Sequence, residues 1–371
     1  MNNTFYLKLI SKINLSINNN YKDNYDFYRF GKENYGAKGI KGIILKYIIS
    51  KKFLFRWEAT NKVLNALELS YKYFNALERI YEILHNKESK ELLVDLITYR
   101  LLGHKQVKLP INDNHYWKLI EIVKSLAVKN DTIDSHFMQF VLYKFNLNKI
   151  GYNIQLYSTT LGIVIVFLLE QYAYKSANKT IVEVEKGEVI LDIGACWGDT
   201  ALYFANKTGE DGKVYSFEFI PDNIKIFNIN IELNPSLKDR IELIQHPVSN
   251  KSGDKIYYTN NGPVSKIEFE PFDGQTSVAT TLSIDDFVNN NNIKKIDFIK
   301  MDIEGAELLA LEGAIETIKR FKPKLAIAIY HSMDDFVNIP NWINNLNLGY
   351  KLYLGHYTIH AEETVIFAKV D

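Results

Sequence analysis

The sequence predicts an α/β fold in which a mainly parallel sheet follows a mainly helical N-terminal region. From residue 189 onward, short apolar runs alternate with helical stretches, a pattern typical of parallel strands joined by right-handed crossovers. Before about residue 155, apolar residues recur mainly at helical spacing. We therefore expect two regions, 1–155 and 156–371. At 371 residues and 47% hydrophobic content, the chain can bury a large core.

Three amphipathic stretches support the helical N-terminal region. One face of the first stretch carries Leu64, Leu67, Tyr71, Phe74, Leu77, Tyr81 and Leu84. Ser89 suits the N-cap of a second helix that ends near Gly103, and Ser135 to Phe145 is the third stretch. Such stripes more often pack within one chain than between subunits, so a homo-oligomer is left open.

The sheet is expected from seven apolar segments. They are 189–193, 214–218, 241–245, 298–302, 325–330, 351–354 and 364–369. Only about nine residues without a helical pattern separate the last two, so we expect these two strands to pair antiparallel. Residues 251–280 interrupt the alternation, and we place them at the border of a substrate site.

The turn after the first of these strands has the features of a ligand cradle. Gly194 and Gly198 allow a sharp turn and a close approach of the backbone to a ligand. Glu218 lies twenty residues beyond Gly198 at the end of the next strand, where a carboxylate can accept both hydroxyls of a ribose. The pattern therefore predicts a site for a nucleotide-type cofactor.

The charges around this turn indicate which cofactor it holds. The glycines stand four apart, not in the G-x-G-x-x-G order that serves a pyrophosphate. Asp192 and Asp199 add negative charge, which suits a ligand with an ammonium and a sulfonium, so we predict S-adenosylmethionine. The predicted cofactor-binding residues are Asp192, Gly194, Ala195, Cys196, Gly198, Asp199, Glu218 and Phe219.

These motifs resemble those of class I S-adenosylmethionine-dependent methyltransferases. The stretch from Ile296 to Ala314, which contains Lys-Met-Asp-Ile-Glu-Gly-Ala-Glu, is similar to the signature of the FkbM-type methyltransferases. The resemblance covers about residues 170–370 and implies a seven-stranded, Rossmann-like sheet with a reversed last strand. It also implies an O-methyltransferase that acts on a hydroxyl of a sugar, glycan precursor or secondary metabolite.

Three residues are the candidates for the chemistry. Methyl transfer to a hydroxyl requires that a base remove its proton. Asp302 and His331 follow the ends of neighbouring strands, where α/β sheets bind ligands, and Glu304 lies on the loop beyond Asp302. The alternatives are structural: Glu307 or Glu304 as a helix cap, Asp302 as the partner of a lysine, and His331 as a hydrogen-bonded residue at a strand end.

Composition and charge limit the partners. Residues 1–150 carry 24 Lys/Arg and 14 Asp/Glu, a net charge of +10, which leaves −10 for residues 151–371. These opposite charges favour either docking of the two halves or an anionic acceptor. We expect no nucleic-acid substrate, because no stacking aromatics and arginines form a recognisable module. A divalent metal is compatible with Asp302, Glu304 and His331 but is not required by the sequence.

The expected location is the cytoplasm. Cys196 is the single cysteine, which excludes a disulfide within the chain and fits a reducing compartment. No signal peptide is visible, and the nine-residue apolar run 161–169 is far shorter than the ~20 residues of a transmembrane helix. Two other functions remain open at this point: a methyltransferase with a nitrogen or other non-hydroxyl acceptor, and a non-catalytic module that binds the cofactor or a partner.

Overall fold

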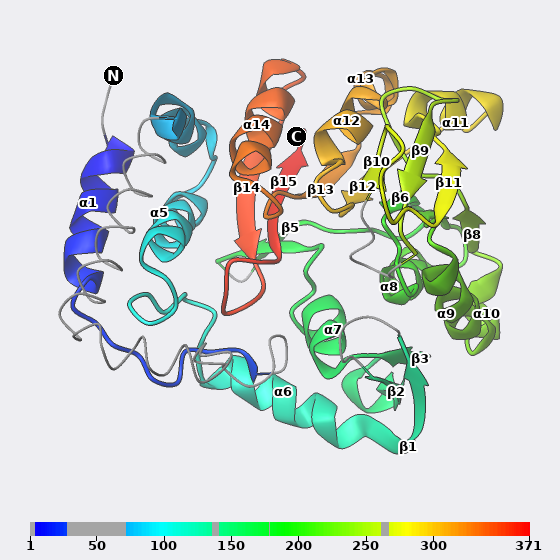
Figure 1. Cartoon of the computed structure of the whole chain (residues 1–371), viewed down its shortest axis with the longest axis horizontal. Coiled ribbons are helices and arrows are strands. Elements are labelled where there is room, and N and C mark those ends of the chain that lie inside the picture. Colours follow the sequence, from blue (N-terminus) through cyan, green and yellow to red (C-terminus); the bar gives the residue numbers. More distant parts are fainter. Residues whose placement is uncertain (1–3, 28–71, 136–140, 178, 261–266) are drawn as a thin grey trace. The chain divides into compact units, whose positions relative to one another are not determined.

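Seven strands form the largest sheet of the computed structural model. They are β6 (Val189–Ile193), β7 (Lys213–Phe217), β8 (Ile241–Ile244), β12 (Phe298–Met301), β13 (Lys324–Ala328), β14 (Lys351–His356) and β15 (Thr364–Lys369) (Figure 1). Their order is β14-β15-β13-β12-β6-β7-β8. β15 is antiparallel to both β13 and β14, and the pairs from β13 to β8 are parallel. The predicted strands and the reversed last strand are thus confirmed.

The structure describes residues 4–27, 72–135, 141–177, 179–260 and 267–371. The chain divides into two compact units, one of residues 1–113 with 358–361 and one of residues 114–357 with 362–371. Among the described residues, no helix is long and apolar enough to cross a membrane.

Helices connect the strands of the sheet. In chain order they are α8 (Asp199–Thr208), α9 (Pro221–Glu232), α10 (Pro235–Lys238), α11 (Ile284–Asn290), α12 (Glu307–Glu312), α13 (Ile315–Phe321) and α14 (Met333–Asn345). Local sequence sets where several of them begin. Pro221 occupies the first turn of α9, and the side chains of Ser283 and Ser332 cap α11 and α14. α8 packs against β6, β7 and β8.

Residues 251–280, where the sequence predicted an interruption, contain a small separate sheet. Its strands are β9 (Lys255–Tyr258), β10 (Ile267–Glu268) and β11 (Ser277–Thr280). They pair antiparallel in the order β10-β9-β11. The insertion therefore forms a sheet of its own between β8 and α11.

The segment that precedes the large sheet contains short helices and strands. These are α6 (Asn114–Leu126), β1 (Ala127–Asp134), β2 (Val141–Asn146), a 3₁₀ turn (Leu147–Ile150), β3 (Gln155–Ser158), α7 (Thr160–Ile163), a π-helical turn (Val164–Leu168), β4 (Tyr174–Ser176) and β5 (Lys179–Val182). β1, β2 and β3 form a three-stranded antiparallel sheet. The apolar run 161–169 lies largely buried in α7 and the π-helical turn, as expected. This segment belongs to the larger unit, so the two units divide between residues 113 and 114.

The expectation of a helix from Ser135 to Phe145 is wrong. Residues 141–145 belong to strand β2, and 136–140 lie outside the described residues. Leu142 and Phe145 are buried three residues apart, a spacing that also fits a helix. Pairing of β2 with β1 and β3, which local periodicity does not reveal, decides for a strand.

The side chains of two asparagines connect β3 to α9 and the residues that follow it. The Asn230 amide accepts a hydrogen bond from Tyr157 N–H at 2.7 Å and donates one to Tyr157 O at 3.0 Å. Asn234 makes the same pair of hydrogen bonds with the backbone of Gln155. The two amides therefore satisfy the open edge of β3 as a neighbouring strand would.

In the unit of residues 1–113 and 358–361, the described secondary structure is mainly helical. It contains α1 (Thr4–Ser16), helical residues 72–83 and α5 (Lys87–Leu102). α5 ends before Gly103, as predicted. Its N-cap is Asn86 and not Ser89, because the Asn86 side chain accepts the Ser89 N–H. Of the first amphipathic stripe, Leu64, Leu67 and Tyr71 lie outside the described residues, whereas Leu77, Tyr81 and Leu84 are buried.

A histidine from far along the chain lies in this helical unit. His360 Nε2 accepts the Asp26 N–H at 3.0 Å, so the ring proton of the neutral form resides on Nδ1. That nitrogen lies 2.7 Å from the Tyr99 hydroxyl. Residues 358–361 therefore complete a core that otherwise comes from residues 1–113.

Candidate active site

Two positions in the loop from β6 to α8 have a backbone that requires glycine. Gly194 and Gly198 have φ values of 83° and 84°, in the left-handed region that favours glycine. A Cβ on Gly194 would lie 1.9 Å from the carbonyl oxygen of Asp302, and one on Gly198 would lie 2.9 Å from the ring of Phe227. Side chains at these two positions would therefore displace the loop. The N–H groups of Gly194 and Ala195 both donate to Phe217 O at 3.0 Å.

A buried ion pair between Asp192 and Lys300 holds the start of this loop. Asp192 and Lys300 are aligned on the neighbouring strands β6 and β12, and Lys300 Nζ lies 3.1 Å from Asp192 Oδ1. Lys300 also donates to the carbonyl oxygens of Ile193 and Gly194, at 3.2 and 2.5 Å. The other Asp192 oxygen accepts from the Thr200 hydroxyl at 2.9 Å. Asp192 is therefore engaged inside the protein, and its predicted contact with a cofactor stays a prediction.

Glu218 lies directly after β7, where the sequence placed it. Its carboxylate accepts hydrogen bonds from the N–H groups of Phe219 and Ile220, at 2.7 and 2.8 Å, and from the Asn223 amide at 3.1 Å. Burial raises the pKa of the Glu218 carboxyl, and these hydrogen bonds oppose that effect. The Phe219 ring contacts Tyr258 edge-on, with centroids 5.1 Å apart. The side chain that would hold a ribose is thus fixed in direction.

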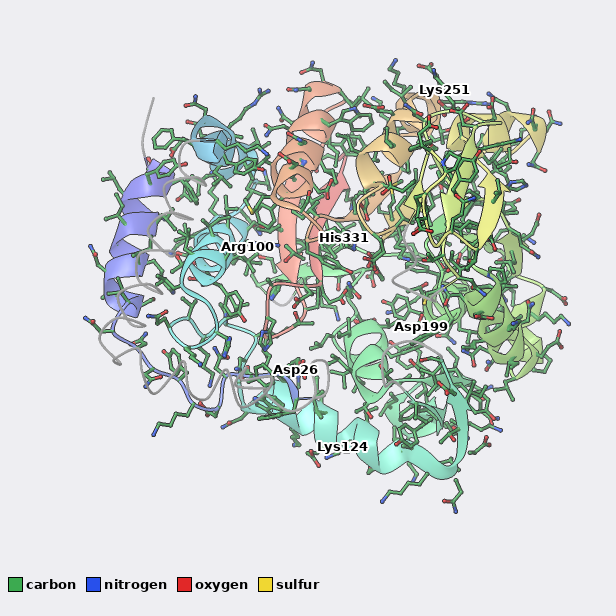
Figure 2. All side chains as sticks on the ribbon, viewed as in Figure 1. Asp26, Arg100, Lys124, Asp199, Lys251 and His331 are labelled. Carbon is green, nitrogen blue, oxygen red and sulfur yellow. The ribbon has the colours of Figure 1, made fainter. Side chains whose placement is uncertain are left out.

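Two other predicted cofactor residues, Cys196 and Asp199, lie between β6 and the start of α8. Asp199 is the first residue of α8 (Figure 2). Burial raises the pKa of the Asp199 carboxyl to about 6. Burial also raises the pKa of the Cys196 thiol well above its usual range, so this thiol stays protonated and is a poor nucleophile. Cys196 thus acts as a small side chain in the loop.

The three candidate catalytic residues lie together. Asp302 follows β12, His331 follows β13, and Glu304 is on the loop between β12 and α12. His331 Nε2 lies 3.3 Å from Asp302 Oδ1 and 3.6 Å from Glu304 Oε2. The cluster adjoins the loop after β6, because Gly194 packs against the Asp302 backbone.

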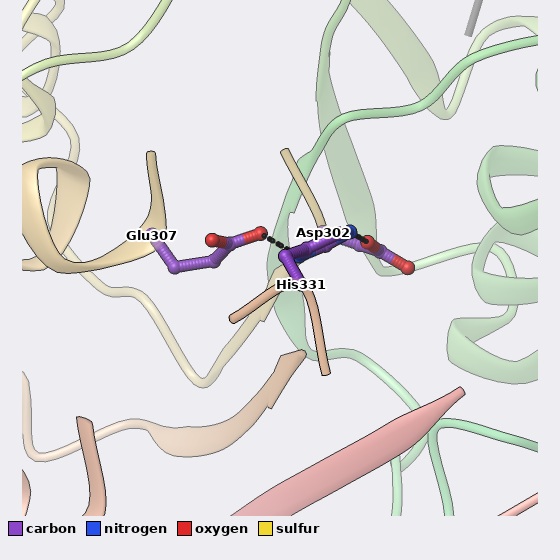
Figure 3. Close-up of side chains that lie close together, drawn as sticks. All are labelled: Asp302, Glu307 and His331. Atoms are coloured by element: carbon purple, nitrogen blue, oxygen red, sulfur yellow. Dashed lines mark ion pairs between the residues drawn. The ribbon is translucent and has the colours of Figure 1, made fainter. Parts of the chain in front are cut away.

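A fourth residue, Glu307, completes the cluster and was missed as a site residue. Its Oε1 lies 3.1 Å from His331 Nδ1, on the opposite side of the ring from Asp302 (Figure 3). The same oxygen accepts the N–H of Ile303 at 2.8 Å, and Ile303 lies in the loop before α12. The signal that could have found it is the Asp-x-Glu-x-x-Glu spacing, which places several carboxylates near the end of one strand.

Asp302 is held by tyrosines. The hydroxyls of Tyr172 and Tyr330 donate to its carboxylate, at 3.1 and 3.2 Å. The alternative in which Asp302 pairs with a lysine does not apply, since Lys300 pairs with Asp192 and Lys324 pairs with Glu185 and Glu188.

Burial and mutual charge shift the pKa values in this cluster. Burial lowers the pKa of His331, but Glu307, Asp302 and Glu304 outweigh it and raise the pKa to about 9. Burial raises the pKa of Glu304 to about 7 and also raises that of Asp302, while the nearby His331 lowers both. The ring is therefore an imidazolium at neutral pH unless a substrate changes its surroundings.

The donor atoms of Asp302, Glu307 and His331 lie within 4.8 Å of one another, a spacing that suits a metal ion. A ring nitrogen binds an ion along its own lone pair. Because Glu307 faces Nδ1 and Asp302 faces Nε2, one ion on the ring would not be shared by both carboxylates. The arrangement therefore favours a histidine with one carboxylate beside each ring nitrogen over a three-ligand metal centre.

Together, the glycine loop after β6, the acidic residue after β7 and the titratable cluster after β12 and β13 define a Rossmann-like methyltransferase domain. Residues 192–352 match the family model described as the methyltransferase FkbM domain. The resemblance of the two motifs to FkbM-type methyltransferases is thus confirmed for this part of the chain.

Among the known proteins that resemble the chain are two methyltransferases. The 2-O-methyltransferase NoeI of Sinorhizobium fredii (strain NBRC 101917 / NGR234) is 28% identical over 150 residues, which cover 36% of this chain and 59% of NoeI. The crystal structure of methyltransferase FkbM from Methylobacillus flagellatus KT matches with a TM-score of 0.51 at 18% identity, and the match covers 81% of this chain and 59% of that one. The chain thus spans about three fifths of each relative, and the second likeness shows the fold alone.

The buried ion pair leads to a stability prediction. Replacing Lys300 by Met should lower the free energy of unfolding by about 3–5 kcal/mol, because Asp192 would remain charged and buried without its partner. Urea titration followed by circular dichroism measures this change. The control is Lys319→Met, which removes an exposed pair with Glu316 and should have little effect. Equal small effects of both variants would contradict the role given to Lys300.

Proposed function

We propose that this protein is an S-adenosylmethionine-dependent O-methyltransferase whose acceptor is a hydroxyl of a sugar, glycan precursor or other secondary metabolite. The observation that carries the proposal is the contact between the loop after β6 and the cluster after β12. Gly194 on that loop packs directly against the Asp302 backbone. A methyl donor held on the loop would therefore lie beside the residues that we assign to the acceptor.

The residues of the loop fit the proposed cofactor. Glu218 is directed by three hydrogen bonds at the end of β7, where it would accept the ribose hydroxyls. Asp199 adds a carboxylate at the start of α8 that would face a cationic group. When bound, S-adenosylmethionine supplies a methyl group already activated by a sulfonium.

His331 is the proposed base, and the carboxylates of Asp302 and Glu304 lie near its Nε2. As the acceptor oxygen bonds to the methyl carbon, the methyl–sulfur bond of the cofactor would break and leave a neutral thioether, and the hydroxyl proton would move to His331 Nε2. The ring then becomes an imidazolium, which Asp302 at 3.3 Å and Glu304 at 3.6 Å stabilise. These residues thereby align the hydroxyl and take up its proton.

The nature of the acceptor is supported by similarity and by charge. NoeI is named a 2-O-methyltransferase, and the similar region covers 150 residues. The net charge of +10 over residues 1–150 supports an anionic acceptor, such as a nucleotide-linked or phosphorylated sugar. On this proposal, the N-terminal region helps to shape access of the acceptor.

The first functional prediction concerns Glu218. Glu218→Ala should weaken binding of S-adenosylmethionine by about 1.5–3 kcal/mol, the scale of hydrogen bonds to a charged group, measured by calorimetry. Because Glu218 also accepts N–H groups at the start of α9, the thermal transition of the variant is recorded as well. Glu242→Ala on β8 is the control. Unchanged affinity would remove Glu218 from the ribose role, and tight binding of NAD would overturn the cofactor assignment.

The second prediction concerns catalysis. Asp302→Ala and His331→Ala should each lower kcat by about 10²–10⁴-fold, the usual loss of general acid–base help, with cofactor affinity nearly unchanged. The measurement is transfer of a labelled methyl group to nucleotide-sugars and glycans. His246→Ala, an exposed histidine hydrogen-bonded to Thr280 O, is the matched control and should keep full activity. If both site variants were fully active, the catalytic assignment would be wrong.

The third prediction concerns pH. Since Nε2 must be deprotonated to accept a proton, kcat should rise with pH up to about 9, the raised pKa of His331. If kcat instead rose with a midpoint near pH 7, the base would be assigned to Glu304, whose pKa is raised to about 7. We expect EDTA to leave the rate unchanged; its complete inhibition, reversed by a divalent ion, would show a metal requirement.

The fourth prediction concerns the charge of the acceptor. The KM for a nucleotide-sugar should rise several-fold with added salt, because about 0.1 M salt already screens charges beyond about 10 Å. A neutral oligosaccharide serves as the comparison, and kcat should stay constant for both. A KM that is independent of salt would argue against an anionic acceptor.

A further inference from the structure

Glu307 makes a contact that its position in the chain does not require. It is the first residue of α12, where a carboxylate often stabilises the helix from an exposed position. Here the side chain is fully buried, at 0% exposure, and its Oε2 has no hydrogen-bond partner. Burying a carboxylate is costly unless a cation or donors compensate. One N–H from Ile303 at 2.8 Å does not explain the burial, whereas the His331 ring at 3.1 Å does.

The two nitrogens of His331 have different surroundings. Nδ1 faces the buried Glu307. Nε2 faces Asp302, whose side chain is 16% exposed, and Glu304, whose side chain is 52% exposed. The ring itself is 9% exposed, and both of its nitrogens are buried. The more exposed neighbouring carboxylates therefore lie on the Nε2 side of the ring.

We propose that Glu307 is the positioning residue of the active site: it holds the Nδ1 proton of His331 and thereby presents the Nε2 lone pair to the acceptor hydroxyl. This inference rests on the function proposed above and adds a residue and its role to it. The hydrogen bond made by one ring nitrogen sets which nitrogen carries the proton. With Nδ1–H on the side of Glu307, the neutral ring has its free lone pair on Nε2, the side where the more exposed Glu304 lies. Proton transfer from the acceptor to Nε2 then gives an imidazolium between Glu307 and Asp302.

The test follows His331 directly, in the full-length protein and without an acceptor. Proton–nitrogen correlation spectra of the protein with labelled histidine report the tautomer and the titration of each of the 8 histidines, and His331→Gln identifies the signal. Above the pKa, wild-type His331 should carry its proton on Nδ1. In Glu307→Ala the proton should move largely to Nε2, and in Glu307→Gln the titration should shift to lower pH by at least tenfold in proton affinity. Asp302, Glu304, Asp335 and Tyr330 also surround the ring, so their contribution must be separated.

The variant Glu304→Gln separates the effect of charge near the ring from the effect of Glu307, because it removes one charge near Nε2 and leaves the surroundings of Nδ1 unchanged. It should shift the titration while Nδ1 keeps its proton. For turnover, Glu307→Gln should lower kcat by about 10²–10⁴-fold with KM little changed, as expected when a base loses its orienting partner. A wild-type ring protonated on Nε2, or identical titrations of wild type and Glu307→Gln, would overturn the proposal. If His331 responds as expected but no hydroxyl acceptor is ever methylated, the proposed function fails and the orienting contact stands.

Discussion

The buried contact between Asp192 and Lys300 is the interaction on which the rest of the site depends. It joins the two central strands β6 and β12, and Lys300 also binds the carbonyl oxygens that begin the glycine loop. Two residues beyond Lys300, the backbone of Asp302 limits the space above Gly194. One cation therefore connects the strand that leads to the cofactor loop with the strand that leads to the proposed base. Removing it would leave a charge in a nearly dry interior.

The second constraint is an excess of carboxylates around one imidazole. Asp302, Glu304 and Glu307 approach the His331 ring within 3.1–3.6 Å. Such a cluster stabilises positive charge more than a neutral ring. In the proposed reaction, positive charge leaves the cofactor as the methyl group moves, and it appears on His331 as the proton moves. The cluster would thus favour the products of the proton transfer, at the cost of a resting ring that is protonated at neutral pH.

The strands of the large sheet and the residues of the cofactor loop could largely be predicted from the sequence, because the central strands are buried on both faces. Segments such as Val189–Ile193 then consist almost entirely of apolar residues, and the glycines and acidic residues in and after them stand out. The partner of Lys300 and the role of Glu307 could not be predicted, since both depend on alignment between strands and on a loop with positive φ at Glu304 and Gly305. The error at β2 has a similar cause: its partners β1 and β3 lie elsewhere in the sequence.

The position of His360 has a consequence for how the chain is made. Residues 358–361 belong to the compact unit of residues 1–113, where His360 binds Asp26 and Tyr99. A ribosome releases the N-terminal helices long before it has synthesised His360. The helical unit therefore cannot finish its core during the early part of translation, although it comes first in the chain. It must wait, with one part of its interior missing, until the connection between β14 and β15 has emerged.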